Sequence, residues 1–252
     1  MTTIAVFVDP PREGLVGTEL AETSPLTSSE AADFYAACIK DAILAAERSG
    51  GELLVNYRPD DLIPEEFHGE QSAEAEVRAL VADALGDTSD VRFEVQVGST
   101  FDARAGNTVS HLLREEGVQS VAIVRGNAPM LLRTAIDSAA MKLRTNDVLL
   151  GPSTEGRVYY AAFREAIDFE GAFETPELDT LADRADDTGH TTEFIPMQPV
   201  VETGDDLATF LPLLESRVTA ERIVPKHTAT LVRELGLRVE TDDAGDLTVV
   251  RD

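Results

Sequence analysis

The sequence predicts an α/β fold, a three-layer α/β/α sandwich around a mostly parallel sheet. Short β-rich runs alternate with helical stretches along the whole chain. Two of these runs, residues 3–8 and 119–124, are dominated by apolar residues, which is typical of strands buried on both faces. Strands that alternate with helices form parallel sheets whose two faces are covered by those helices.

The elements of the first half follow from apolar spacing and from signals at helix ends. After the strand at 3–8, apolar residues recur at helical spacing over 29–48. Thr27 and Glu30 form a candidate capping box at the start of this helix, and Gly50-Gly51 ends it. The same reasoning predicts strands at 52–57 and 91–97 and helices at 72–85 and 107–116.

The second half continues the alternation and adds a C-terminal extension. The strand at 119–124 is followed by a helix over 129–144, with Pro129 near its first turn. We expect one domain over residues 1–221, with residues 222–252 as an extension packed on the same domain. Further predicted elements are strands at 147–150, 157–163 and 193–197, helices at 176–188, 205–217 and 225–235, and a hairpin across residues 243–245.

Composition excludes several classes of protein. With 252 residues, 43% of them apolar, the chain is long enough to bury a sizeable core. No apolar run approaches the roughly 18 residues that a membrane span needs. The first residues have no basic region ahead of the strand-like run, so we expect no secretion signal and a cytoplasmic location. A single cysteine, Cys38, excludes an internal disulfide framework and a cysteine-rich metal site.

The charge balance is strongly acidic. Asp and Glu number 47 against 21 Lys and Arg, which gives a formal net charge of −26. Such a domain repels itself in dilute buffer, whereas at about 1 M salt the Debye length falls to about 3 Å and the repulsion is screened. We therefore expect a halophilic protein from a salt-rich cytoplasm. Sequence-independent nucleic-acid binding needs a basic face and is not expected.

The turns after the strands are the places to look for a site. In a mostly parallel sheet, ligands bind in the crevice at the carboxyl ends of the strands, near the switch in strand order. These turns are residues 9–20, 125–131, 151–157 and 198–206. The first, DPPREGLVGTEL, combines prolines with glycines and can present backbone N–H groups to an anion. It contains neither the dinucleotide fingerprint nor the P-loop motif, so an ordinary surface loop is the open alternative.

Five segments, in order, resemble one known family. They are FVDPPREGLVGTEL with the following PLTSSEAADFYAACIKDAI, NAPML at 127–131, DVLLGPSTEGRVYYAAF at 147–163, FETPELDTLADRADDTGH at 173–190 and VVETGDDL at 200–207. Over roughly residues 3–215 the chain thus resembles glycosyltransferase-A-type, nucleotide-diphospho-sugar-transferase-like proteins of the radical-SAM-associated type. Their distant relatives are the molybdenum-cofactor and phospholactate guanylyltransferases.

The resemblance implies that the chain binds a nucleotide or a nucleotide-sugar. Such families use a basic first loop for the phosphates and acidic residues for a divalent metal, Mg²⁺ or Mn²⁺. Hard cations of this kind take oxygen ligands and bridge phosphates. The matching metal positions are Asn127, Glu155 and Glu202, and the two glutamates are also the catalytic candidates. The expected phosphate contacts are Arg12, Gly14, Thr18, Arg125 and Arg157.

The departures from the family pattern fall on the positions that carry chemistry. In the first loop both basic positions are lost, and Glu19 stands where an arginine would attract a phosphate. Asn127 replaces a metal-binding aspartate, Glu155 replaces another, and the closing acidic segment has Val200 and Glu202. An acidic drift in composition does not explain the replacement of aspartate by asparagine or valine. Metal-dependent transfer is therefore in doubt.

Three interpretations remain open. The chain binds a nucleotide or nucleotide-sugar with a reduced metal set, or it is a non-catalytic binding or scaffold protein that keeps the fold. The third is a metal-independent transferase in which Arg125 or Arg157 replaces the cation. Arg104 is expected to pair with Asp102 or a neighbouring acid, with a ligand contact as the alternative. The four histidines are far apart in sequence and lack the spacing of metal ligands.

Overall fold

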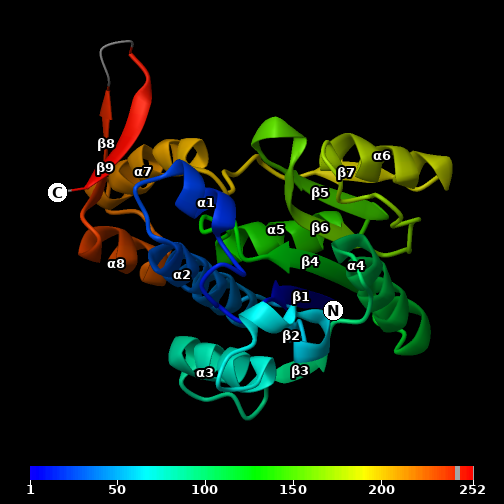
Figure 1. The fold of residues 1–252 in the computed structure, drawn as a ribbon. Helices are drawn as coiled ribbons and strands as arrows, with labels where there is room; N and C mark the ends of the chain where they lie inside the picture. Colours follow the sequence, from blue (N-terminus) through cyan, green and yellow to red (C-terminus); the bar gives the residue numbers. More distant parts are fainter. Residues whose placement is uncertain (242–244, 252) are drawn as a thin grey trace.

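A computed structural model describes residues 1–241 and 245–251 and places a seven-stranded sheet at the centre (Figure 1). The strand order is β3-β2-β1-β4-β6-β5-β7. β6 runs antiparallel to β4 and β5, and the other pairings in this sheet are parallel. The strands are β1 Thr2–Val8, β2 Glu52–Tyr57, β3 Arg92–Val95, β4 Ser120–Arg125, β5 Val148–Pro152, β6 Val158–Phe163 and β7 Thr192–Phe194.

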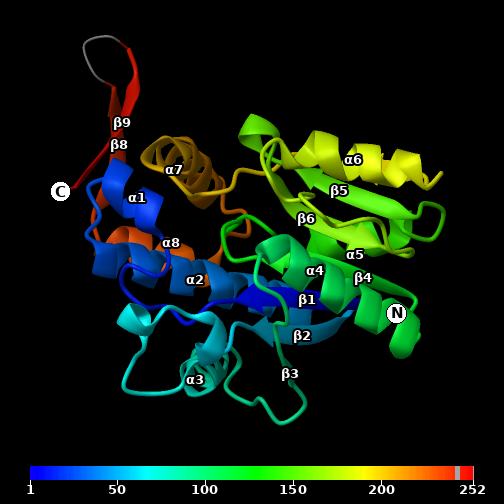
Figure 2. The same ribbon diagram turned by 45° about the vertical axis from the view of Figure 1, so that its right-hand side comes forward.

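Helices cover both faces of this sheet (Figure 2). On one face, α2, α3 and α5 share a core with the strands, in which Ile43 of α2 and Ile4 of β1 are fully buried. On the other face, α4 and α6 contribute Val109 and Leu181 to a core with Phe7. The expected three-layer α/β/α fold is confirmed. The helices are α2 Ser28–Glu47, α3 Ala73–Leu85, α4 Phe101–Ser110, α5 Arg133–Lys142 and α6 Glu177–Asp187.

The strand order switches direction between β1 and β4. From β1 the chain adds β2 and then β3 on one side, and β4 then pairs with the opposite side of β1. In α/β sheets this arrangement leaves a crevice at the carboxyl ends of the two central strands. The turns after β1 and β4 therefore meet at one edge of the sheet. Because β6 is antiparallel, the residues that precede it lie at the same edge.

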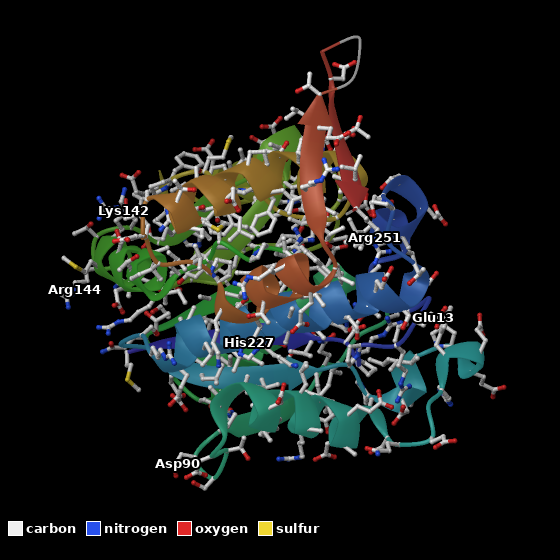
Figure 3. The ribbon with its side chains drawn as sticks, turned by 90° about the vertical axis from the view of Figure 1, so that its left-hand side faces the viewer. Glu13, Asp90, Lys142, Arg144, His227 and Arg251 are labelled. Carbon is white, nitrogen blue, oxygen red and sulfur yellow. The ribbon has the colours of Figure 1, made fainter. Side chains whose placement is uncertain are left out.

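The C-terminal residues pack against α2 and α7 (Figure 3). Asp41 of α2 is buried and accepts bonds from the backbone N–H groups of His227 and Thr228, at 3.0 and 2.8 Å. Its carboxylate thereby caps the start of α8. Arg251 on the last strand forms an ion pair with Glu30 at 2.6 Å. The elements are α7 Gly204–Thr219, α8 Lys226–Glu234, β8 Leu237–Thr241 and β9 Leu247–Arg251.

Two predicted helix starts differ from the structure by four residues or more. The helix expected at 107–116 begins as α4 at Phe101, where the Thr100 side chain accepts a bond from the Ala103 N–H. The helix expected from Pro129 begins at Arg133, because residues 128–131 form a turn first, with Leu131 N–H bonded to the Ala128 carbonyl at 3.0 Å. A short helix within the first loop was not predicted. Residues 242–244 of the expected hairpin turn lie outside the described residues, while both flanking strands are present.

Short helical segments complete the described chain. No helix among residues 1–241 and 245–251 is long and apolar enough to cross a membrane. The remaining segments are α1 Thr18–Thr23, the 3₁₀ turns η1 Asp60–Leu62, η2 Glu65–Phe67 and η4 Thr154–Gly156, and the π-helical segment η3 His111–Glu115.

Candidate functional site

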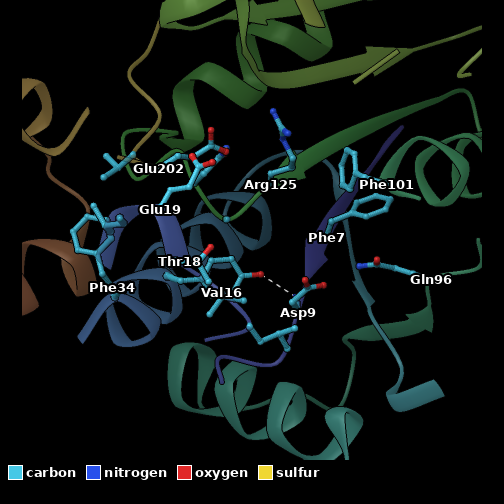
Figure 4. Close-up of a pocket in the computed structure, with 18 of the residues that line it drawn as sticks. Phe7, Asp9, Val16, Thr18, Glu19, Phe34, Gln96, Phe101, Arg125 and Glu202 are labelled. Atoms are coloured by element: carbon cyan, nitrogen blue, oxygen red, sulfur yellow. Dashed lines mark hydrogen bonds between the residues drawn. The ribbon is translucent and has the colours of Figure 1, made fainter. Parts of the chain in front are cut away.

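A cavity of about 330 Å³ opens at the carboxyl ends of β1 and β4, and we call it the strand-end cavity (Figure 4). Its lining comes from segments far apart in sequence. They are Phe7 at the end of β1 and Asp9 after it, residues 15–20, the first half of α2, Gln96, Phe101 and Arg104 beyond β3, residues 125–127 at the end of β4, and residues 201–202. The cavity therefore occupies the crevice that the switch in strand order creates.

The first loop reaches the cavity through its second half. Gly17 has a φ of 66°, and a Cβ there would lie 2.9 Å from the Ala31 carbonyl oxygen, so the loop packs closely on α2. This packing places Thr18 and Glu19, both exposed, in the cavity lining. Asp9 at the start of the loop donates its N–H to the Tyr35 hydroxyl at 2.9 Å.

The first half of the loop turns away from the cavity. The side chain of Arg12 is 9% exposed and bonds to Glu76 at 3.0 Å and to Asp60 at 3.2 Å. It also donates to the carbonyls of Phe67 and Gln71, so its guanidinium holds the segment after β2 in place. Gly14 has a φ of 76°, and its Cα faces the Phe67 ring. Neither Arg12 nor Gly14 belongs to the cavity lining.

Arg125 lies at the end of β4 and does line the cavity. Its Nη2 donates to the Val158 carbonyl at 2.9 Å and to Glu177 at 2.7 Å. Its guanidinium carbon lies 5.4 Å from the centroid of the Phe101 ring. Burial raises the pKa of Glu177 although Arg125 opposes the shift. Arg125 thus stabilises a buried carboxylate while its side chain borders the cavity.

Asn127 and Glu202, two of the expected metal positions, are in direct contact. Asn127 Nδ2 donates to Glu202 Oε1 at 2.6 Å. The other oxygen, Oε2, accepts from Arg157 Nη1 at 3.0 Å. Both oxygens of Glu202 are therefore engaged by N–H donors, while Asn127 Oδ1 is buried without a partner. Both residues line the cavity.

Arg157 is the centre of a buried ion cluster. Nη1 and Nη2 donate to Asp206 at 2.8 and 2.6 Å, Nη2 also donates to Thr154 Oγ1 at 2.8 Å, and Nε donates to the Thr154 carbonyl at 3.2 Å. With the bond to Glu202, all five N–H groups of the guanidinium have a protein acceptor. The bonds to Asp206 and Glu202 outweigh burial and raise the pKa of Arg157. The side chain of Glu155 is 77% exposed, and its Oε2 lies 3.6 Å from Arg157 Nη2. Neither Arg157 nor Glu155 lines the cavity.

The three expected metal positions do not fit a divalent cation in this arrangement. Mg²⁺ and Mn²⁺ need converging oxygen ligands. Glu202 instead turns both oxygens to N–H donors, Glu155 points to solvent, and the fixed positive charge of Arg157 lies beside them. No group of three or more Asp, Glu, His or Cys in residues 1–241 and 245–251 is arranged to hold a metal ion.

Of the residues in the cavity lining, Gln96 was not predicted as a ligand candidate, and Arg104 was considered one only as the alternative to an ion pair. Gln96 belongs to no motif. Arg104 was expected to pair with an acid such as Asp102, but Asp102 Oδ1 accepts the Phe173 N–H at 2.7 Å and forms no ion pair with Arg104. The available signal was their position, because both flank the turn that follows the predicted strand at 91–97.

Comparisons with known proteins identify the fold. No family model and no curated protein sequence matches the chain. Among solved structures, a candidate nucleotide-diphospho-sugar transferase from Desulfovibrio desulfuricans G20 matches with a TM-score of 0.73 at 18% identity, over 92% of this chain and 94% of that one. The chain therefore has the fold of nucleotide-diphospho-sugar transferases.

More distant matches have related names. A 4-diphosphocytidyl-2C-methyl-D-erythritol synthase from Anaerococcus prevotii DSM 20548 has a TM-score of 0.49 at 10% identity, over 85% of this chain and 98% of that one. Rv0371c from Mycobacterium tuberculosis H37Rv, in complex with manganese, has a TM-score of 0.46 at 15% identity, over 84% and 97%.

Proposed function

We propose that this chain, with its nucleotide-diphospho-sugar transferase fold, binds a nucleotide or nucleotide-sugar in the strand-end cavity without a divalent cation. The observation that carries the proposal is the position of the cavity at the switch between β1 and β4. Open α/β sheets bind their ligands at this point because two loops separate there and expose strand ends and helix starts.

The size and lining of the cavity support a ligand of this kind. A volume of about 330 Å³ lies within the range of about 300–1,000 Å³ typical of small-molecule sites. Aromatic side chains from three elements, Phe7, Phe34 and Phe101, supply flat apolar walls for a base or sugar ring. Arg125 supplies positive charge at the end of β4. Thr18 adds a hydroxyl from the first loop.

Independence from metal follows from the arginine cluster. Arg157 stands among the carboxylates of Glu202 and Asp206 and balances their charge from within the protein. This arrangement supports the interpretation that a side-chain cation takes the structural place of a metal. Since every N–H group of Arg157 is already bonded, its role is to hold Glu202 and Asn127 in place and not to contact a phosphate. We propose binding, and no metal-dependent transfer, as the function of the site in a salt-rich cytoplasm.

Calorimetric titration in molar KCl tests the proposal. ATP, GTP, CTP, UTP and UDP-glucose are titrated into the protein once with Mg²⁺ and once with EDTA. We expect binding of at least one of them with equal affinity in both buffers. Binding that appears only with Mg²⁺ contradicts metal independence. The absence of binding across the whole panel contradicts the proposal and favours the scaffold alternative.

A gain-of-affinity variant locates the ligand. Glu19→Arg replaces an acid in the cavity lining with the charge that attracts a phosphate. A new hydrogen bond to a charged group is worth about 1.5–3 kcal/mol, so we expect affinity to rise about tenfold. Glu22→Arg makes the same charge change on the same short helix, outside the cavity lining, and is expected to leave affinity unchanged.

A further inference from the structure

Among residues 1–241 and 245–251, two arginines are buried as whole residues, and their surroundings differ sharply. Arg157 has carboxylates on three sides. Arg104, which is 9% exposed, forms no ion pair within residues 1–241 and 245–251. Its Nε is buried without any partner, and its one side-chain bond is from Nη1 to the Ser99 carbonyl at 3.5 Å. The chain has 47 Asp and Glu, so a lack of available acids does not explain this.

The position of Arg104 is unfavourable for a merely structural cation. Burying a charge without a partner costs free energy, and guanidinium groups remain protonated in proteins. Arg104 also lies in the first turn of α4, where the helix dipole disfavours positive charge. Burial lowers the pKa of Arg104, and the positive charge of Arg58 adds to this, while Asp9 and Asp102 oppose it. An unpaired cation in such a place is suited to an anion that arrives from outside.

Gln96 lies in the same lining and has an unused acceptor. It is 2% exposed, and its Nε2 donates to the Asn56 carbonyl at 2.8 Å. This bond fixes the amide so that Oε1 is the free atom, and Oε1 is buried without a partner. In Figure 4 the side chain of Gln96 points toward Asp9, next to the rings of Phe7 and Phe101. Those rings pack edge to face at 5.4 Å.

The turn between the two residues is built rigidly. Gly98 has a φ of 134°, and a Cβ there would lie 2.9 Å from the backbone nitrogen of Arg104. Asn107 Nδ2 donates to the Val97 carbonyl at 2.7 Å from the next turn of α4. The turn is therefore tied to the start of α4, and Gln96 and Arg104 on either side of it both belong to the cavity lining.

We infer that Gln96 and Arg104 form an anion subsite of the strand-end cavity, which takes a compact carboxylate or phosphate bearing a neighbouring hydroxyl group. Arg104 donates to the anion, and Gln96 Oε1 accepts from the hydroxyl. Asp9, the acid of the lining that interacts electrostatically with Arg104, is paired with Arg58 at 3.3 Å and so repels such an anion less than a free carboxylate does. The inference rests on the proposed function only in placing the ligand in this cavity.

Small anions test the subsite directly. The affinities of inorganic phosphate, glycolate and acetate are measured by calorimetry in molar KCl. We expect phosphate and glycolate to bind, and acetate, which lacks the hydroxyl, to bind more weakly. Arg104→Met is expected to weaken all three by at least about tenfold, the value of a charged hydrogen bond. Gln96→Leu is expected to remove the preference of glycolate over acetate. Arg114→Met, an exposed arginine outside the cavity, is the matched control.

The thermal stability of the unliganded variants distinguishes a binding role from a structural one. Since Arg104 has no carboxylate partner, Arg104→Met is expected to leave the melting temperature unchanged or to raise it. A clear fall overturns the inference, as does equal binding of the anions by wild type and Arg104→Met. If Arg104→Met does not fold, the wild type decides, because equal affinity for glycolate and acetate overturns the inference.

Nucleotide titrations separate this inference from the proposed function. If nucleotides bind equally to wild type and Arg104→Met and no small anion binds, the proposed function stands and the inference fails. If glycolate binds to wild type but not to Arg104→Met, and no nucleotide binds, the anion subsite stands and the proposed function fails. Competition identifies the source of the anion. If the subsite holds a phosphate of the nucleotide, the nucleotide displaces bound inorganic phosphate. If the subsite holds the anion of a second substrate, the small anion and the nucleotide bind together.

Discussion

Replacement of Asp206 by asparagine tests the buried cluster most directly. The substitution removes the charge that faces both terminal nitrogens of Arg157, at 2.8 and 2.6 Å. Removing one partner of a buried ion pair costs about 3–5 kcal/mol, because the remaining charge stays buried. Glu202 still contacts Arg157 at 3.0 Å, and asparagine keeps an oxygen that can cap α7. We therefore expect the free energy of unfolding to fall by about 3 kcal/mol, the lower end of this range.

Urea unfolding in molar KCl measures this loss. Asp205→Asn is the matched control, since Asp205 is the exposed neighbour in the same helical turn and its loss is expected to cost less than about 0.5 kcal/mol. A loss below about 1 kcal/mol for Asp206→Asn refutes the reasoning, because it implies that Arg157 finds other partners or water.

The pH dependence of the same variant gives a second check. The bonds from Arg157 and from backbone N–H groups outweigh burial and hold the pKa of Asp206 below its usual value. A carboxyl with a depressed pKa contributes stability that is fully present above the unfolded-state value of about 3.9. This contribution disappears as the pH falls through the folded-state pKa. The difference between wild type and Asp206→Asn is therefore expected to shrink below about pH 4, and a difference that grows on acidification contradicts the argument.

Three further outcomes are expected. Lowering KCl from molar to about 0.1 M lengthens the Debye length to about 10 Å, so the melting temperature should fall, and a constant value contradicts salt adaptation. Arg125→Met leaves buried Glu177 without its cation and should lower the free energy of unfolding, measured in urea, by about 3–5 kcal/mol at neutral pH. The loss should be smaller near pH 4, where that carboxyl is protonated. Asp41→Ala removes the acceptor for the N–H groups of His227 and Thr228 and should lower the free energy of unfolding by about 2 kcal/mol. Proteolysis after residue 221 should become faster, and an unchanged rate of cleavage argues against the capping role of Asp41.

The sequence predicted the fold because its local signals agree with one another. The Thr27–Glu30 capping box is present, and α2 begins at Ser28, one residue from the expected start. The start of α4 was placed six residues too late, because Gly98, Ser99 and Thr100 resemble a loop and Phe101, the first residue of the helix, was not recognised as part of it. The antiparallel direction of β6 is consistent with its five-residue connection to β5, because so short a connection can join only antiparallel neighbours.

The candidate site was predicted less completely than the fold. The convergence of Asn127 and Glu202 follows from their places after strands at the same edge of the sheet. The placement of Arg12 and Arg157 outside the cavity lining depends on acids 45 to 64 positions away in sequence. Whether a given arginine is free or paired is decided by those tertiary contacts. For the same reason the unpartnered state of Arg104 was not apparent from its sequence neighbours.

The cap that Asp41 provides has a consequence for the synthesis of the protein. The acceptor lies in α2, near the start of the chain, and its donors follow 186 and 187 positions later. While the ribosome is still translating the intervening segment, this carboxylate and the apolar side of α2 around Cys38 are exposed to water. The nascent molecule can assemble its central sheet before it completes the last layer. The addition of α8, β8 and β9 is therefore the event that closes this side of the protein.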